Sequence, residues 1–172
     1  MSMSLQQEPR TTVSRRTTHA QFLTFKLDDQ EYALAIANVV QVVRMVALSR
    51  LPQAPEGVEG VINLRGQVIP VINLRKRCGL PAQPYTVNSQ LLIAQSHGRS
   101  MALIVDVVSE VLALPATQIE APERVAPQLQ QLCGVGKVGN RLILILNPDS
   151  LWPVVPVAAP AAARPNFLEQ IQ

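Results

Sequence analysis

The sequence is poor in the residues that carry most protein chemistry. Its 172 residues include two cysteines, two histidines and 3% aromatic residues. Cys78 and Cys133 are too few for a disulfide framework, and we interpret both as small core residues. His19 and His97 are dispersed with them along the chain, without the ligand spacing of a metal site. We therefore expect no metal and no cofactor.

Charge and long apolar runs are also sparse. Charged residues make up 16% of the chain, and the net charge is +3. Arg10, Arg15 and Arg16 carry much of this excess, which is too little for a basic face that binds nucleic acid by counterion release. No run of 18 apolar residues occurs, and the start, MSMSLQQEPR, lacks the apolar region of a signal peptide. The expected location is the reducing cytoplasm.

Catalytic motifs are missing as well. Gly134, Gly136 and Gly139 form a GxGxxG pattern, but RLILILN follows and is typical of a strand. A dinucleotide site needs a helix there. No serine stands in a nucleophile elbow. Asp106 is the one acid in an apolar strand pattern, and we interpret it as a carboxylate bound to nearby backbone. We expect no catalytic residues, and hence no enzyme.

The chain is rich in strand-forming residues. Apolar residues reach 48%, mostly valine, isoleucine, leucine and alanine, and branched side chains pack well on a pleated sheet. Leu23, Phe25 and Leu27 alternate with polar neighbours, which predicts a first strand with one buried face. Residues 36–46 fit either a helical turn or a strand. Many short strands between turns predict an all-β barrel or sandwich.

An internal repeat divides the chain into two similar halves. Residues 58–74 match residues 132–147 at an offset of 74 (134 − 60). Residues 32–43 match residues 101–112 at an offset of 69 (101 − 32). Related segments in the same order at similar offsets indicate a duplicated structural unit.

The two copies differ at the tip of the predicted hairpin in residues 61–74. Arg65 stands where the second copy has Gly139, so the turn itself does not need an arginine. A guanidinium on a rigid turn can bind carboxylates in bidentate fashion and act as a binding hot spot. The alternative is a solvated turn residue, and the residues alone leave both open.

These motifs together resemble a known family. GVINLRG at 60–66, VIPVINLR at 68–75 and MALIVDVVSEVL at 101–112 are similar to the CheW-type adaptor (coupling) domain of bacterial chemotaxis. The resemblance divides the chain into a disordered N-terminal tail (1–19), a CheW-like domain (20–152) and a Pro/Ala-rich C-terminal tail (153–172).

The resemblance implies both a fold and a function. The fold would be two SH3-like five-stranded β-barrel subdomains on a shared hydrophobic core, with short helical turns. The function would be a non-enzymatic adaptor, or scaffold, that couples chemoreceptors to a CheA-type histidine kinase. Its partners would be the kinase regulatory domain and the cytoplasmic tip of a methyl-accepting receptor, with neither nucleic acid nor membrane insertion. It would be cytoplasmic and reach membrane receptor arrays through these partners.

The resemblance also implies a set of protein-binding positions: Arg65, Gly60, Gly66, Val39, Gln41 and Val111. The arginine matches the family's functionally important hairpin arginine, and the two glycines match those that shape this hairpin. The two valines match apolar positions of the surface that meets the receptor tip. Gln41 falls where many relatives have glutamate.

The chain departs from the family at three acidic positions. Gln41, Asn73 and Asn147 stand where relatives commonly carry acids, although asparagine can still hydrogen-bond its local turn. This suggests an alternative chemosensory pathway, controlling surface motility or second-messenger output. Two other functions stay open: a nucleic-acid-binding β-barrel, which needs stacking aromatics on a basic face, and the adaptor half of a CheV-type protein, which needs a fused receiver domain.

Overall fold

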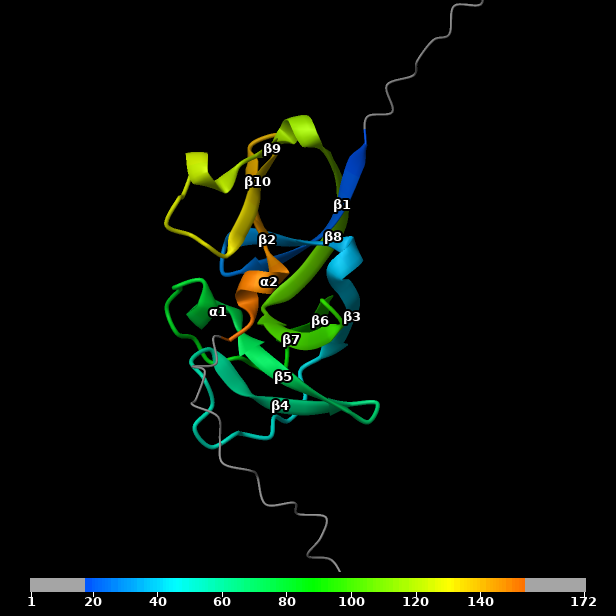
Figure 1. The fold of residues 1–172 in the computed structure, drawn as a ribbon, viewed down its shortest axis with the longest axis vertical. Coiled ribbons are helices and arrows are strands. Elements are labelled where there is room, and N and C mark those ends of the chain that lie inside the picture. Colours follow the sequence, from blue (N-terminus) through cyan, green and yellow to red (C-terminus); the bar gives the residue numbers. More distant parts are fainter. Residues whose placement is uncertain (1–17, 154–172) are drawn as a thin grey trace, which may run out of the picture.

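The computed structural model describes residues 18–153, which form two β-sheets (Figure 1). We call the larger sheet and its helical turns lobe A. Its six strands lie in the order β8-β1-β2-β11-β10-β9. They are β1 (His19–Leu27), β2 (Gln30–Ala35), β8 (Val107–Pro115), β9 (Ile119–Glu120), β10 (Leu132–Val138) and β11 (Arg141–Leu146).

The second sheet forms lobe B, with the strand order β3-β6-β7-β5-β4. Its strands are β3 (Val39–Arg44), β4 (Val58–Leu64), β5 (Gln67–Asn73), β6 (Gln90–Ser96) and β7 (Arg99–Val105). Short helical turns complete the fold: η1 (Ile36–Asn38), α1 (Leu74–Arg77), η2 (Ala116–Gln118), η3 (Pro122–Arg124) and α2 (Pro148–Leu151). The predicted all-β fold of two SH3-like subdomains is confirmed, and the two-residue strand β9 adds a sixth strand to lobe A.

The two sequence repeats are interleaved in space. The first half contributes β1 and β2 to lobe A but β3, β4 and β5 to lobe B, and the second half does the reverse. Accordingly β3 pairs with β6, and β8 pairs with β1. The parallel pairs β5–β7 and β11–β2 are likewise equivalent. Each lobe is therefore completed by strands from the other half of the chain.

The ambiguous segment at residues 36–46 contains both structures that the pattern allowed. Ile36–Asn38 forms the 3-10 turn η1, and β3 follows with alternating burial along Val39–Arg44. This segment carries the chain from lobe A to lobe B. The predicted N-terminal tail overlaps β1 by one residue, His19. Except for Thr18, His19 and Pro153, both predicted tails lie outside the described residues.

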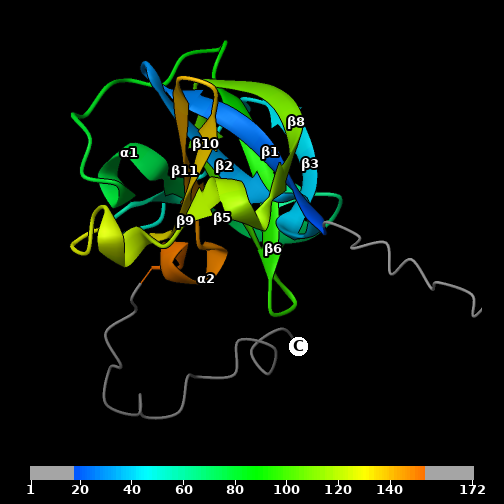
Figure 2. The ribbon, with the colours of Figure 1, turned by 90° about the horizontal axis from the view of Figure 1, so that it is seen from above.

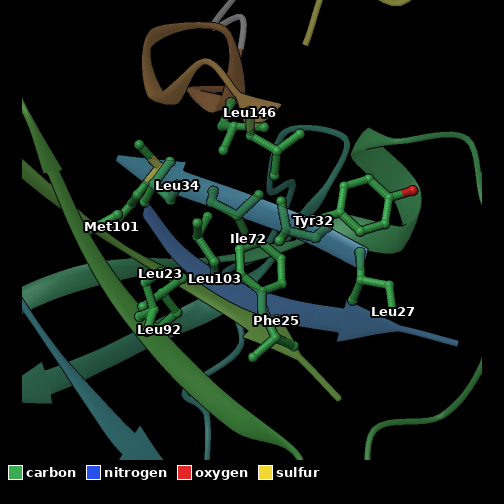
Figure 3. Packing of buried hydrophobic residues seen from close by; sticks show 14 of the residues in the cluster. Leu23, Phe25, Leu27, Tyr32, Leu34, Ile72, Leu92, Met101, Leu103 and Leu146 are labelled. Carbon is green, nitrogen blue, oxygen red and sulfur yellow. The ribbon is translucent and has the colours of Figure 1, made fainter. Parts of the chain in front are cut away.

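A hydrophobic core is shared between the lobes (Figure 3). Phe25 and Tyr32 stack there with ring centroids 6.1 Å apart. Burial raises the pKa of the Tyr32 phenol to about 12. The core contains fifteen buried residues: Leu23, Phe25, Leu27, Tyr32, Leu34, Ile72, Leu74, Leu92, Ala94, Met101, Leu103, Val105, Leu132, Leu146 and Leu151. The predicted shared core is confirmed.

Strand β1 buries both of its faces, so the prediction of one buried face was wrong. Leu23 and Phe25 enter the shared core, while Phe22 on the opposite face enters the interior of lobe A. Thr24 is also buried, and its hydroxyl donates to the Glu110 carbonyl at 3.0 Å. This hydrogen bond replaces the bond to water that the hydroxyl loses on burial, so a polar residue can occupy a buried position.

The two cysteines differ in their surroundings. Cys78 packs against the shared core, and burial raises the pKa of its thiol to about 11. Cys133 is an exposed residue of β10 whose thiol donates to the Leu146 carbonyl at 3.5 Å. The interpretation as a core residue holds for Cys78 and was wrong for Cys133.

Glycines at equivalent positions shape the two long hairpins. Both hairpins shift register, between Val58 and Gly60 and between Leu132 and Gly134. A Cβ atom on Gly60 would lie 2.5 Å from the Ser49 carbonyl oxygen, and one on Gly134 would lie 2.8 Å from Ile119. The glycines of the GxGxxG pattern thus serve close packing in β10 and a turn at Gly139.

We expect Gly60→Ala to lower the free energy of unfolding by about 1–3 kcal/mol, because the added methyl group meets backbone that cannot rotate away. Gly66→Ala is the matched control. A Cβ atom there meets nothing within 4 Å, and only its left-handed backbone disfavours alanine, by about 1–2 kcal/mol. Urea unfolding measures both changes. A loss for Gly60→Ala no larger than for Gly66→Ala would show that Ser49 yields easily.

Candidate functional site

The hairpin between β4 and β5 holds Arg65 in a strained backbone conformation. Arg65 and Gly66 form its two-residue turn, with φ values of 53° and 83°. The Gly66 N–H donates to Asn63 Oδ1 at 2.8 Å and so braces the turn. The left-handed region costs a non-glycine residue about 1–2 kcal/mol. Glycine, which the second repeat carries as Gly139, would avoid this cost.

The Arg65 side chain is exposed and makes no ion pair within residues 18–153. On the adjoining strand, Val68 is 67% exposed. We call Arg65, Gly66 and Val68 the hairpin surface. Strained residues that persist without a structural need are candidates for function. Here the strained turn carries the Arg65 guanidinium, which has no ion-pair partner among the described residues, and the exposed Val68 lies on the strand that follows.

Gly60 lies on the same hairpin but is buried beneath Ser49. Its position fits a role in shaping the hairpin, whereas Gly66 is exposed at the turn. Gly60 thus lies within β4 and Gly66 in the turn that follows it, and the two glycines do not form one contact area.

The other predicted binding residues lie on β3 and β8, which run on the same side of the molecule in Figures 1 and 2. Val39 and Gln41 on β3 are half-buried, and Val39 packs against the shared core. Val111 on β8 is exposed. Sequence reasoning missed Val40 and Val42, which are exposed on β3. We call Val40, Val42 and Val111 the strand-edge surface.

The repeat gave a signal for one of these residues. Val42 matches Val111 at the offset of 69, and Gln41 matches Glu110. The Glu110 carboxylate accepts a hydrogen bond from Arg141 at 3.0 Å. Since Gln41 is neutral, lobe B has an uncharged side chain where lobe A has a carboxylate in an ion pair.

Asn73 and Asn147 begin α1 and α2. Asn73 Oδ1 accepts the Lys76 N–H at 3.3 Å, and Asn147 Oδ1 accepts the Asp149 N–H at 3.1 Å. The expectation that both asparagines bond their local turns is confirmed. Asn73 Nδ2 also donates to Glu59 at 2.9 Å, a bond that an ionised aspartate could not make.

A buried arginine that the sequence did not reveal joins the two lobes. Arg75 on α1 donates to both carboxylate oxygens of Asp28 at 2.8 Å and to Asp106 at 2.6 Å. The Asp28 N–H also donates to Asp106 at 2.8 Å. The interpretation of Asp106 as a carboxylate bound to backbone was correct but omitted its ion pair. We call Arg75, Asp28 and Asp106 the interlobe cluster.

The hydrogen bond from Arg75 holds the pKa of Asp28 below its ordinary value of 3.8. A depressed carboxyl pKa contributes stability that is present above the unfolded-state value and is lost as pH falls through the folded-state value. We therefore expect Asp28→Asn to destabilise the protein at neutral pH and to cost much less well below pH 3.8. Urea unfolding at both pH values tests this. An equal loss at both would show that the charge of Asp28 contributes nothing.

The part of the chain that the structure describes shows no cluster of metal-ligating side chains. No group of three or more histidine, cysteine, aspartate or glutamate residues could hold a metal there. A cavity of about 460 Å³ opens beside the β1–β2 and β10–β11 turns, and its Arg141 and Glu31 already bind each other at 2.8 Å. No helix of residues 18–153 is long and apolar enough to cross a bilayer.

Comparison with known proteins assigns this chain to a family. A family model described as the CheW-like domain matches residues 21–154. The chain belongs to the CheW-like family. Chemotaxis protein CheW of Helicobacter pylori is 32% identical over 132 residues, which cover 76% of this chain and 80% of that protein. Chemotaxis protein CheW of Klebsiella aerogenes is 32% identical over 145 residues, which cover 81% of this chain and 87% of that protein.

A match to a solved structure supports the assignment to this family. The crystal structure of the scaffolding protein TtCheW from Thermoanaerobacter tengcongensis matches with a TM-score of 0.70 and 35% sequence identity. The match covers 75% of this chain and 89% of that one. The hairpin surface and the strand-edge surface thus belong to a CheW-like scaffold fold.

Proposed function

We propose that this CheW-like protein is a non-enzymatic adaptor that couples chemoreceptors to a CheA-type histidine kinase. The observation that carries the proposal is Arg65, which is exposed, unpaired within the described residues and held at a φ of 53°. A turn selected only for stability would carry glycine there, as the second repeat does. Retaining a strained arginine at an exposed tip supports a role in contact with another protein.

The two surfaces suit different contacts. The hairpin surface combines a guanidinium with an exposed valine, a combination that can bind a carboxylate and exclude water around it. The strand-edge surface is apolar, with Val40 52% exposed and Val111 51% exposed. An apolar surface of this kind suits the apolar face of a helix, such as the tip of a receptor's helical hairpin. We assign the first surface to the kinase and the second to the receptor.

The nucleic-acid alternative is not favoured. Phe22, Phe25 and Tyr32 are each less than 10% exposed. Trp152 is half-buried, and the Arg99 guanidinium covers its ring at 4.0 Å from the centroid. Single-strand binding needs aromatic rings free to stack on bases. Among the described aromatic residues Tyr85 alone is exposed, at 37%, and one exposed ring does not make a stacking platform.

The proposed location is the cytoplasm, at receptor arrays that the protein reaches through its partners. The neutral side chains of Gln41, Asn73 and Asn147 support assignment to an alternative chemosensory pathway, with surface motility or a second messenger as its output. A fluorescent fusion should co-localise with one receptor array in cells. A diffuse distribution in cells that contain such arrays would contradict this assignment.

The direct test is calorimetric titration of the purified protein with the regulatory domain of a CheA-type kinase from its own genome. We expect a dissociation constant near 1 μM, or about −8 kcal/mol. A receptor-tip fragment and a single-stranded oligonucleotide are titrated in parallel. Binding to the oligonucleotide without binding to either protein would replace the adaptor with the nucleic-acid alternative.

A further inference from the structure

The two lobes are joined at a very short crossover. Asp106 is the single residue between Val105, which ends β7 in lobe B, and Val107, which begins β8 in lobe A. Its backbone N–H donates to the Lys26 carbonyl of β1 at 3.1 Å. The orientation of the backbone at Asp106 therefore bears directly on the angle between the lobes.

Arg75 contacts the structure on both sides of this crossover. It extends from α1, directly after β5 of lobe B, and its guanidinium binds Asp106 itself. The same guanidinium binds Asp28, which lies in the β1–β2 turn of lobe A at a left-handed φ of 55°. One side chain thus connects lobe B, lobe A and the crossover between them.

Arg75 and its two carboxylate partners differ in solvent exposure. The Arg75 side chain is 8% exposed, whereas the side chains of Asp28 and Asp106 are 40% and 37% exposed. If the arginine were removed, both carboxylates could be hydrated, so no buried charge would be left unpaired. The fold can therefore persist without Arg75, while the connection between the lobes is lost.

We propose that Arg75 is a positioning residue that fixes the orientation of lobe A relative to lobe B and thereby couples binding at the hairpin surface to binding at the strand-edge surface. The coupling part rests on the proposed function. The hairpin surface belongs to lobe B, and the strand-edge surface combines β3 of lobe B with β8 of lobe A. A partner that spans β3 and β8 contacts both lobes, so its affinity depends on the interlobe orientation that Arg75 fixes.

The chain offers a matched control in Arg141. Its guanidinium also binds two carboxylates, Glu31 at 2.8 Å and Glu110 at 3.0 Å. All three residues lie on strands of lobe A. Arg141→Met therefore removes an equivalent set of charges and bonds without touching the connection between the lobes.

The orientation is tested without any partner. Spin labels are placed at exposed Gln67 in lobe B and exposed Thr117 in lobe A, after both native cysteines are replaced by serine. Pulsed electron–electron double resonance should give one narrow distribution of distances between the two labels, both for the parent protein and for Arg141→Met. We expect Arg75→Met to broaden or shift it. A distribution for Arg75→Met identical to that of the parent would overturn the proposal.

A conservative variant guards against a failure to fold. Arg75→Lys keeps the charge but cannot bind both carboxylates in the planar, bidentate arrangement. We expect it to retain native circular dichroism and to show an intermediate broadening. An unbroadened distribution for the folded lysine variant would likewise reject a positioning role for the guanidinium.

The coupling is tested by titrating the kinase domain with and without a saturating receptor-tip fragment. In the wild-type protein we expect the two affinities to differ by about 5–150-fold. In Arg75→Met this ratio should approach one, while the affinity for the kinase domain alone, whose proposed contact lies within lobe B, stays within about twofold of wild type. Failure of the wild type to bind either partner would reject the proposed function. Binding of both partners with no coupling in the wild type, or with full coupling in Arg75→Met, would reject this inference alone.

Discussion

Replacing Phe25 by alanine should lower the free energy of unfolding by about 3–5 kcal/mol. Phe25 has 0% exposure, lies at the centre of the shared core and stacks on Tyr32 (Figure 3). The cavity left by the ring cannot close easily, because strands from both lobes surround it. Because the net stability of a domain is typically about 5–15 kcal/mol, this loss removes a large part of it and should bring the variant close to unfolding at physiological temperature.

The same variant tests whether the lobes unfold as one unit. Trp152 fluorescence reports the end of α2, and far-ultraviolet circular dichroism reports both sheets, so coincident urea transitions indicate one cooperative unit. Val107→Ala is the control, because Val107 is 47% exposed and should change stability by less than about 0.5 kcal/mol. Two separated transitions in the wild type, or a small loss for Phe25→Ala, would show that the core is not shared energetically.

Replacing Arg65 by glycine should separate stability from function. Glycine adopts the φ of 53° that Arg65 holds without the side-chain penalty, so the free energy of unfolding should rise by up to about 1 kcal/mol. Affinity for the kinase domain should nevertheless fall by about 1–3 kcal/mol, the range of an interface hot spot. Urea unfolding and calorimetry on the same preparation measure the two effects.

Two further variants make this result specific. Arg65→Ala should lose affinity without a gain in stability, because alanine still carries the Cβ atom that disfavours a left-handed conformation. Arg124→Ala removes another exposed arginine, from η3, and controls for the loss of one positive charge. Unchanged affinity in Arg65→Gly for both the kinase and the receptor would reject Arg65 as a contact residue.

Much of the fold could be predicted because the duplication preserved its pattern. The offset between Gly60 and Gly134 identified two equivalent hairpins, and both hairpins shift register there. The interleaving could not be predicted, because a repeat shows which segments are alike but not which sheet each strand joins. The burial of both faces of β1 was missed for a related reason, since Thr24 is polar in sequence but satisfied by the Glu110 backbone.

The candidate site was predicted only where its signal was local. Arg65 was found because the repeat has glycine at the same turn. Arg75 was missed because it stands within a basic segment, while its partners Asp28 and Asp106 lie 47 and 31 residues away in sequence. Val40 was missed because alternation along β3 defines its two faces, but only the folded sheet shows which face is exposed.

The adaptor role is tested most directly by capture in a three-component mixture. An immobilised receptor-tip fragment is incubated with the kinase regulatory domain, with and without the wild-type protein. We expect the kinase domain to be retained only when the wild-type protein is present, and retention to fall strongly with Arg65→Gly but not with Arg124→Ala. Equal retention of the kinase domain with and without this protein, or none in either case, would contradict its role as the link between receptor and kinase.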